Sequence, residues 1–361
     1  MFLSIIIIVF CFYSILMVLF FFGLRNVSKK NASIPKSGIL VSIIVAYKNE
    51  VANLPSLLED LQSQDYPAQQ VEIIFIDDNS TDSGSLLLEN QNLITSLKLN
   101  NAYGKKKAIA LGIAHATHEL IICTDADCRL GKGWVSSIVN HYEMRGAQLI
   151  LSPVFFTHKN SFWHNVLELE FASLIASTAG AAGLNMSIMA NGANIAFTRS
   201  SVNDYVQLSN QKSVSGDDVF LLHAFKKQQM GISFNAQTDA LVETAAPSSL
   251  SAFLRQRFRW SSKSIYYKDK ATIVVALLVF LTSLLQLALL VLSFFSNYYL
   301  ILFLCSIVLK TVFDALVLIP FLKKFNRQYL LKYIVVVEFI YYIYIVFVAV
   351  FSFIVPSKWK N

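Results

Sequence analysis

The sequence predicts an α/β domain with a mainly parallel sheet, joined to several membrane-spanning α-helices. Of its 361 residues 55% are hydrophobic and only 15% are charged, whereas soluble domains carry about 25% charged residues. The apolar residues concentrate near the two ends of the chain. The middle alternates between short β-branched runs and stretches with helical spacing. These three observations predict one α/β domain between membrane segments.

The first apolar segment is residues 1–24, which contain no charged side chain and precede Arg25, Lys29 and Lys30. A helix that crosses a bilayer needs roughly 20 apolar residues. A cleaved signal peptide would carry its basic residues before the apolar run and a small-residue cleavage site after it. Because the charges follow the run here, we expect a retained transmembrane helix and a linker at 25–37.

The second apolar region is residues 271–355. From Ala271 to Leu309 there is no charge, which is long enough for two spans with a break near Ser296-Asn297-Tyr298. A third span is expected from about Tyr333 to Val355. Three C-terminal transmembrane helices are therefore predicted.

The loop before the third span carries Lys323, Lys324, Arg327 and Lys332. By the positive-inside rule this loop and the region after Arg25 are cytoplasmic. The chain is thus expected to be an integral protein of the plasma or inner membrane, with its N-terminus outside and its middle domain in the cytoplasm. Lys358 and Lys360 would then lie outside, against the rule, so the last span fits least well.

Three ionisable residues fall inside predicted spans: Lys310, Asp314 and Glu338. Such residues are functional candidates. Alternatively Lys310 and Asp314, four apart on one helix face, neutralise each other.

The net charge is +7, and the four cysteines show no metal-binding spacing. An excess of positive charge suits contact with anionic lipid headgroups and phosphates. No patterned basic and aromatic stretch argues for nucleic acid, so none is expected as a partner.

The α/β domain is predicted at residues 38–250. Leu40–Ala46, Val71–Ile76 and Glu119–Cys123 are strand-like, and helical stretches at Leu54–Gln64 and Lys105–Thr117 separate them. This repetition implies right-handed βαβ units. Ligands of such sheets bind beyond the carboxyl ends of the strands, so polar residues at those ends are the first site candidates.

Asp77 and Asp78 end the second strand and could accept hydrogen bonds from a base or ribose; a plain turn is the alternative. Lysines 105–107 begin a helix, where a bound diphosphate would explain them; a solvated cluster is the alternative. Asp125 and Asp127 follow the third strand. Two carboxylates at this spacing suit Mg²⁺, which is held by one or two carboxylates plus substrate phosphates.

Asp217 and Asp218 precede an apolar run, so a carboxylate at this helix start could act as general base. N-capping would account for one of them. Residues 251–270 hold the segment Gln256-Arg257-Phe258-Arg259-Trp260 shortly before the membrane. Arg259 could bind phosphate and Trp260 could stack on a sugar, or the segment could be an interfacial helix with arginines at the headgroups.

The ordered set of Asp77-Asp78, Asp125-x-Asp127, Gly216-Asp217-Asp218 and Gln256-x-x-Arg259-Trp260 resembles the D, D, D, QxxRW pattern of family-2 glycosyltransferases. The resemblance covers residues 38–270, and the flanking spans match the membrane-bound branch that includes hyaluronan, cellulose, chitin and poly-N-acetylglucosamine synthases. It implies a GT-A fold with a Rossmann-like sheet.

The resemblance also implies roles for single residues. Asp77 and Asp78 would contact the nucleobase and ribose, usually of a UDP-sugar, and Lys106 and Lys107 would lie near the diphosphate. Asp125 and Asp127 would bind Mg²⁺ or Mn²⁺, with Asp127 the direct ligand. Asp218 would be the catalytic base with Asp217 in support. The segment Asn191 to Asn194 would line the acceptor side, and Gln256, Arg259 and Trp260 would close over diphosphate and acceptor.

One base and one metal imply direct attack of an acceptor hydroxyl on the anomeric carbon, with inversion. The acceptor is expected to be a membrane-associated glycan or lipid. We expect an oligo- or polysaccharide-related transferase, with a single-sugar glycolipid synthase as the alternative, and the few spans suggest an oligomer or partner subunits for a polysaccharide channel. A non-enzymatic scaffold would have lost acidic positions of the pattern, and four spans make a poor transporter.

Overall fold

The computed structural model describes residues 2–28, 38–89, 91, 94–100, 102–202 and 217–352. The chain divides into two compact units, which we call the sheet unit and the helical unit. The sheet unit comprises residues 27–157 and 189–245, and the helical unit comprises 1–26, 158–188 and 246–358, apart from the three terminal residues.

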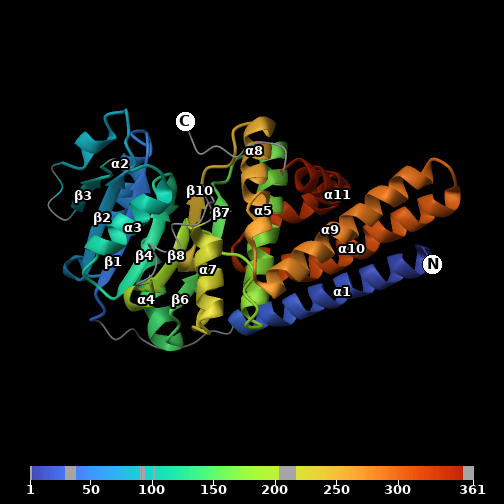
Figure 1. Cartoon of the computed structure of the whole chain (residues 1–361), viewed down its shortest axis with the longest axis horizontal. Coiled ribbons are helices and arrows are strands. Elements are labelled where there is room, and N and C mark those ends of the chain that lie inside the picture. The colour runs from blue at the N-terminus through green and yellow to red at the C-terminus, as the bar shows by residue number, and fades with distance from the viewer. Residues whose placement is uncertain are drawn as a thin grey trace. The chain divides into compact units, whose positions relative to one another are not determined.

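The sheet unit is built on a seven-stranded sheet with the order β3-β2-β1-β4-β8-β6-β9 (Figure 1). Its strands are β1 (Val41–Tyr47), β2 (Val71–Asp77), β3 (Ile94–Lys98), β4 (Leu120–Asp125), β6 (Leu149–Leu151), β8 (Asn194–Thr198) and β9 (Ile232–Phe234). All neighbours are parallel except β8, which runs antiparallel to β4 and β6. The predicted mixed α/β domain with a mainly parallel sheet is confirmed.

A smaller sheet of β5 (Cys128–Leu130), β10 (Val242–Thr244) and β7 (Val154–Phe156) completes this unit. Its helices are α2 (Leu54–Gln62), α3 (Lys105–His115), α4 (Trp134–Arg145) and α7 (Asp217–Lys227). Gly112 brings α3 onto the sheet, because a side chain there would overlap Ile44 and Ile76 of β1 and β2. This close approach fixes which face of α3 meets the strands.

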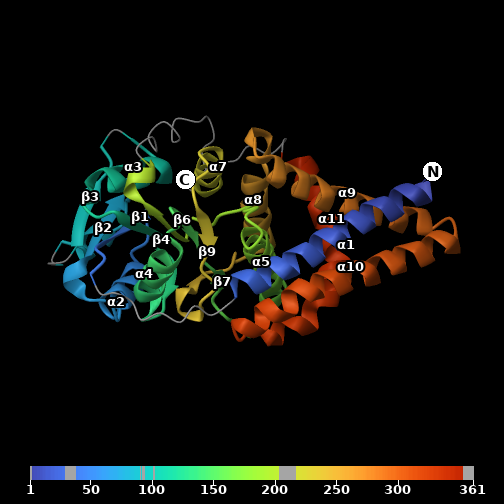
Figure 2. The same cartoon turned by 90° about the horizontal axis from the view of Figure 1, so that it is seen from below.

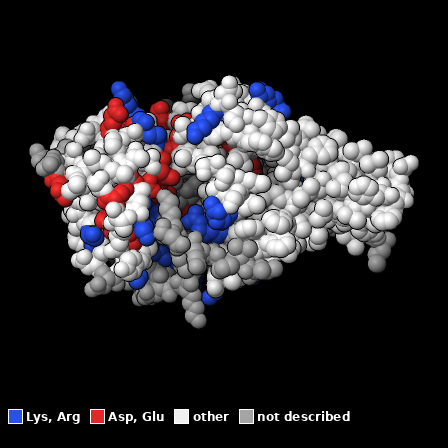
Figure 3. Space-filling model, turned by 90° about the horizontal axis from the view of Figure 1, so that it is seen from above, with Lys and Arg blue, Asp and Glu red and all other residues white. Residues whose placement is uncertain are grey.

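The helical unit contains α1 (Phe2–Val27), α5 (Phe162–Ala182), α8 (Leu250–Ser261), α9 (Lys270–Ser293), α10 (Asn297–Lys324), the short η6 (Gln328–Tyr333) and α11 (Ile334–Phe351). Among the described residues, four helices are long and apolar enough to cross a membrane: α1, α9, α10 and α11 with η6. The end formed by α1, α9 and α10 shows no charged side chain in Figure 3. The predicted break near Ser296 is confirmed, since Ser296 caps the start of α10.

Helix α5 lies inside the 38–250 segment of the sequence and groups with the apolar helices in the helical unit. Small residues let it approach α1 closely, because a side chain on Gly180 or Gly183 would overlap the backbone of α1 near Phe20 and Gly23. Its carboxylates also find their partners there. Glu168 accepts a hydrogen bond from Arg327 at 3.1 Å and one from Tyr329 at 2.9 Å.

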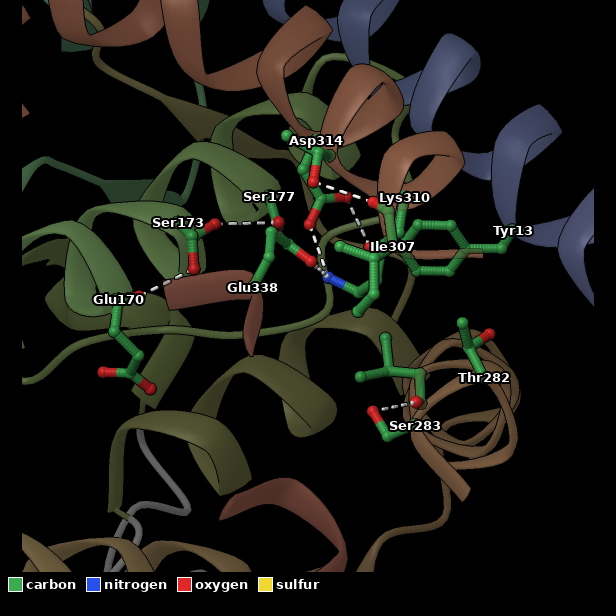
Figure 4. Close-up of polar contacts among 12 residues, drawn as sticks. Tyr13, Glu170, Ser173, Ser177, Thr282, Ser283, Ile307, Lys310, Asp314 and Glu338 are labelled. Carbon is green, nitrogen blue, oxygen red and sulfur yellow. Dashed lines mark hydrogen bonds and ion pairs between the residues drawn. The ribbon is translucent and has the colours of Figure 1, made fainter. Parts of the chain in front are cut away.

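The ionisable residues of the predicted spans form one cluster (Figure 4). The ammonium of Lys310 lies 2.6 Å from Asp314 and 2.9 Å from Glu338, and Tyr13 donates to Asp314 at 2.5 Å. The predicted pairing of Lys310 with Asp314 is therefore confirmed. Each charge has a partner of opposite sign, which lowers its cost in an apolar environment.

Candidate active site

The acidic residues meet at one edge of the large sheet because β1 lies between β2 and β4. In the register of these parallel strands, Tyr47 of β1 pairs with Asp77 and the preceding Ala46 pairs with Asp125. Both carboxylates therefore leave the sheet at its carboxyl edge, one on each side of β1. The expectation that polar residues gather at this edge is confirmed for these two.

Asp77 and Asp78 are both buried, and each accepts a hydrogen bond from a backbone amide. Asp77 accepts from the amide of Ser80 at 2.7 Å, and Asp78 accepts from the amide of Gly104 at 2.8 Å. Lys98 lies 3.9 Å from Asp77. Burial and the nearby Asp77 charge also raise the pKa of Tyr47 to about 12. Asp78 thus ties the end of β2 to Gly104, directly before α3.

The lysine at the acidic edge is Lys105, which forms an ion pair with Asp125 of β4. Lys106, one residue on, is buried with its ammonium 5.4 Å from the centre of the Phe220 ring. Lys107 is exposed. Of the three consecutive lysines, the structure therefore brings Lys105 to the edge, whereas the resemblance pointed to Lys106 and Lys107.

Asp125 and Asp127 are both partly exposed at the turn that follows β4. In the part of the chain that the structure describes, no three His, Cys, Asp or Glu side chains converge as a metal site. Two neighbouring carboxylates are nevertheless the donor set that Mg²⁺ or Mn²⁺ uses when substrate phosphates supply the remaining ligands. The residues present thus fit an ion shared with a nucleotide.

Asp218 lies in the first turn of α7 and is anchored to the loop before β8. Its two carboxylate oxygens accept from the amides of Gly192 at 3.1 Å and Val219 at 2.8 Å. A methyl group on Gly192 would lie 3.6 Å from the Lys105 ammonium and 3.8 Å from a carboxylate oxygen of Asp218. Lys105, Gly192 and Asp218 therefore adjoin one another. The sequence placed Lys105 in the lysine cluster and Gly192 in the segment from Asn191 to Asn194, but it did not predict that these two residues lie beside Asp218.

The other half of the predicted Gly-Asp-Asp motif is described only in part. Gly216 lies outside the described residues, and Asp217 is described by its backbone alone, as the first residue of α7.

Asn194, predicted to line the acceptor side, is buried and fully engaged by protein groups. Its amide donates to the carbonyls of Pro153 at 2.8 Å and Ala240 at 2.7 Å and accepts from the Trp134 indole at 3.0 Å. Such an amide supports the neighbouring loop. Thr124 adds to this support by donating to the carbonyl of Ala193 at 2.9 Å.

Two thiols lie beneath the acidic edge and stay protonated. Burial raises the pKa of Cys123 to about 12. The pKa of Cys128 is also raised, by burial and then by Asp125 and Asp127. Both cysteines are free, and neither is poised as a nucleophile.

The segment Gln256 to Trp260 forms part of α8 in the helical unit. The residue that organises it is the buried Arg257, which pairs with Glu170 of α5 and donates to Gln256 at 3.1 Å. Its guanidinium also lies 4.3 Å from the centre of the Trp260 ring. Burial alone would lower the pKa of Arg257, but Glu170 and Tyr344 outweigh it and raise that pKa.

A mainly parallel α/β sheet with acidic residues at its carboxyl edge and a lysine beside them defines a domain of the GT-A glycosyltransferase type. Residues 42–206 match the family model described as "Glycosyl transferase family 2". The chain therefore contains a glycosyltransferase family 2 domain.

One curated relative is the undecaprenyl-phosphate 4-deoxy-4-formamido-L-arabinose transferase of Proteus mirabilis (strain HI4320). It is 36% identical over 93 residues, which are 24% of this chain and 28% of the relative. The match thus spans less than a third of that relative's length. Among solved structures, the mannosyltransferase PcManGT from Pyrobaculum calidifontis, in complex with GDP-Man and Mn2+, aligns with a TM-score of 0.58 at 17% identity. That alignment covers 94% of this chain and 99% of PcManGT, so the two share a fold.

Proposed function

We propose that this chain is an inverting glycosyltransferase that moves a sugar from a nucleotide-sugar to a lipid acceptor in the membrane. The observation that carries the proposal is the Asp125–Lys105–Gly192–Asp218 arrangement within a glycosyltransferase family 2 domain. It places a carboxylate suited to remove a proton beside groups suited to bind a diphosphate.

The donor side of the reaction rests on Lys105, Asp125 and Asp127. Lys105 exchanges its contact with Asp125 for the diphosphate, while Asp125 and Asp127 would hold Mg²⁺ or Mn²⁺. A bound divalent ion supplies charge neutralisation for the departing nucleoside diphosphate. Asp77 and Asp78 would lie beside the nucleoside of the donor, at the carboxyl edge of the large sheet. A UDP-sugar is the first donor to test and a GDP-sugar the second, because PcManGT was solved with GDP-Man.

Asp218 acts on the acceptor. Its carboxylate takes the proton of the acceptor hydroxyl as the hydroxyl oxygen bonds to the anomeric carbon and the bond to the diphosphate breaks. No protein nucleophile takes part, so the configuration at that carbon inverts. The amides of Gly192 and Val219 hold the carboxylate in place throughout.

The acceptor is proposed to be a lipid phosphate. This proposal favours the transfer of a single sugar to a lipid, which was the alternative, over the expected oligo- or polysaccharide-related transferase. The name of the Proteus mirabilis relative specifies undecaprenyl phosphate, and four apolar helices accompany the domain here. We propose that the catalytic domain lies in the cytoplasm, as the positive-inside rule predicts from the basic residues after Arg25 and before the last apolar helix. The parts assigned to Gln256, Arg259 and Trp260 stay predictions from the resemblance.

The test incubates the purified full-length chain in nanodiscs with UDP- and GDP-sugars, Mg²⁺ or Mn²⁺, and undecaprenyl phosphate, and reads the lipid by mass spectrometry. One added sugar supports the proposal. A ladder of products would indicate a polymerase instead. No transfer and no nucleotide release with any donor would refute enzymatic activity, and a matched reaction with EDTA tests the need for the ion.

A further inference from the structure

Helix α11 passes the length and hydropathy criteria for a membrane span but is oriented differently from the other three. In Figures 1 and 2, α1, α9 and α10 run lengthwise beside one another, whereas α11 runs across them. All four helices belong to the helical unit. Their contacts show whether α11 can cross the same bilayer.

The direction of the bundle follows from pairs along α1 and α10. Ile6 and Phe10 of α1 share an apolar cluster with Phe303 and Ile307 of α10, and further along both helices Tyr13 donates to Asp314. The two helices therefore run parallel. With α9 antiparallel to α10 in a hairpin, these three helices share one axis.

Helix α11 crosses α10 steeply. Near one end of α10, the ring of Phe303 contacts Phe339 at 6.5 Å and Tyr342 at 5.8 Å. Seven residues later, Lys310 lies 2.9 Å from Glu338 and 4.5 Å from the Tyr341 ring. That step covers about 10 Å along α10, yet the partners on α11 shift by one residue. Helices that run alongside each other would exchange partners at equal rates.

Both ends of α11 also return to the same pair of helices, α5 and α8. At its start Tyr333 accepts from Asn165 of α5 at 3.1 Å. Further along, Tyr344 donates to Glu170 of α5 at 2.9 Å. At its end Ser352 meets Ser261 of α8 at 3.1 Å. These contacts run from Tyr333 to Ser352, which are 19 residue steps apart, or about 28 Å of helix.

Helix α5 lies across the C-terminal ends of α1 and α10. Glu168 in its first half contacts Arg327 just after α10, and Gly183 just beyond it accepts from Asn26 at 3.2 Å near the end of α1. Ser261 on α8 precedes α9 by nine residues. A helix that remains in contact with α5 and α8 over its whole length cannot reach the opposite membrane surface.

The exposed face of α11 is a single apolar stripe. It includes Val335, Phe339, Ile343, Phe347 and Val350, each 40–55% exposed, at steps of three or four residues along the helix. Ile340 and Phe351 are also exposed and widen the stripe. The opposite face carries the buried Glu338 and the hydrogen bond of Tyr344 to Glu170. This buried face is otherwise apolar, with Ile334, Val337 and Val348 beside Glu338. The in-plane orientation therefore rests on the contacts of α11 with α5, α8 and α10.

We propose that α11 lies in the plane of the membrane, in the leaflet on the side of the catalytic domain, with its stripe against the lipid acyl chains. The chain then crosses the bilayer three times, through α1, α9 and α10. Its C-terminus returns to the side of the catalytic domain. Lys358 and Lys360, which lie beyond the described residues, then obey the positive-inside rule that a fourth span would violate.

The first test is sidedness. Single cysteines replace Lys358 at the C-terminus, the exposed Lys132 of the catalytic domain and the exposed Phe295 between α9 and α10, in a chain whose native cysteines are alanine. Intact cells are treated with a membrane-impermeant maleimide before and after permeabilisation. Lys358→Cys and Lys132→Cys are expected to react together, and Phe295→Cys in the opposite condition. Labelling of Lys358→Cys together with Phe295→Cys would overturn the proposal.

The second test is depth, measured by electron paramagnetic resonance of spin labels in nanodiscs. Labels at Val335, Phe339, Ile343 and Phe347 are expected at one common depth. Labels on the exposed face of α10, at Ile301, Val308 and Val312, serve as the matched control and should differ by up to about 16 Å. A similar gradient along α11 would show that it spans the membrane.

Discussion

Replacing Asp218 by asparagine separates the chemical step from nucleotide binding. The carboxylate accepts from two amides, at 3.1 Å from Gly192 and 2.8 Å from Val219. Asparagine has almost the same shape but only one acceptor oxygen, so one of these bonds is lost. That loss costs about 1–3 kcal/mol of stability. Loss of the base is larger in its effect on rate, since a general base contributes about 10²–10⁴-fold.

A matched control is Asp82→Asn in the same domain. Asp82 also accepts from two backbone amides, Val51 at 2.9 Å and Gly84 at 3.1 Å. The substitution should therefore cost a similar amount of stability. The kcat of Asp82→Asn is expected to stay within about threefold of the wild type. Asp82 does not act as the general base, so its loss leaves the rate contribution of that base intact.

The assay measures lipid product by mass spectrometry, nucleotide affinity by calorimetry and the unfolding temperature by intrinsic fluorescence. Asp218→Asn is expected to lose at least about 100-fold in kcat with nucleotide affinity retained. Wild-type turnover in Asp218→Asn would refute the assignment of the base. Loss of nucleotide binding would show that Asp218 belongs to the donor side instead.

Three further changes test other parts of the structure. Lys105→Met should raise KM for the nucleotide-sugar at least about tenfold, since a lost charged hydrogen bond costs about 1.5–3 kcal/mol. The control Lys132→Met, on an exposed turn, should leave KM unchanged. Equal effects of the two substitutions would argue against Lys105 as the phosphate ligand. The second change concerns His141, whose pKa burial and then Arg145 lower to about 4. Unfolded histidine binds its proton near pH 6.5, so stability is full above that pH and falls by about 3 kcal/mol as pH drops from 6.5 to 4. His141→Gln should flatten that part of the stability curve measured by chemical unfolding, and an unchanged slope would contradict the assignment. Gly183→Ala should lower the unfolding temperature by several degrees, because the added methyl group overlaps the backbone of α1. The control Gly131→Ala has open space around the added methyl group and should leave the unfolding temperature unchanged. Equal unfolding temperatures of the two variants would count against the close helix crossing.

The acidic edge could be predicted because it depends on local rules. Parallel strands end at one edge, and Asp77 and Asp125 follow apolar runs of strand length. The lysine could not be chosen in the same way, because three consecutive lysines begin α3. The face of α3 that meets the sheet is set by Gly112 against Ile44 and Ile76. Lys105 precedes Gly112 by seven residues and shares its face, a signal that the sequence contains.

The placement of α5 and α11 depends on partners far along the chain. Glu168 and Glu170 look like ordinary surface residues of an amphipathic helix until Arg327, Tyr344 and Arg257 pair with them. Composition likewise predicts α11 as a span, because hydropathy measures how apolar a helix is and carries no information about its direction. The placement of α5 and α11 therefore depends on polar pairs between residues far apart in the sequence, which the local hydropathy pattern does not contain.

The hydrogen bond from Tyr13 to Asp314 joins residues 301 positions apart, which has a consequence for biogenesis. At ribosomal rates of about 5–20 residues per second, α1 waits about 15–60 s in the bilayer before its partner is synthesised. During that interval the tyrosine hydroxyl must form its hydrogen bonds with lipid headgroups, water or an insertion chaperone. Lys310 and Asp314 then enter together on one helix as a neutral pair. Assembly of this membrane domain is therefore completed only when the last fifth of the chain has emerged.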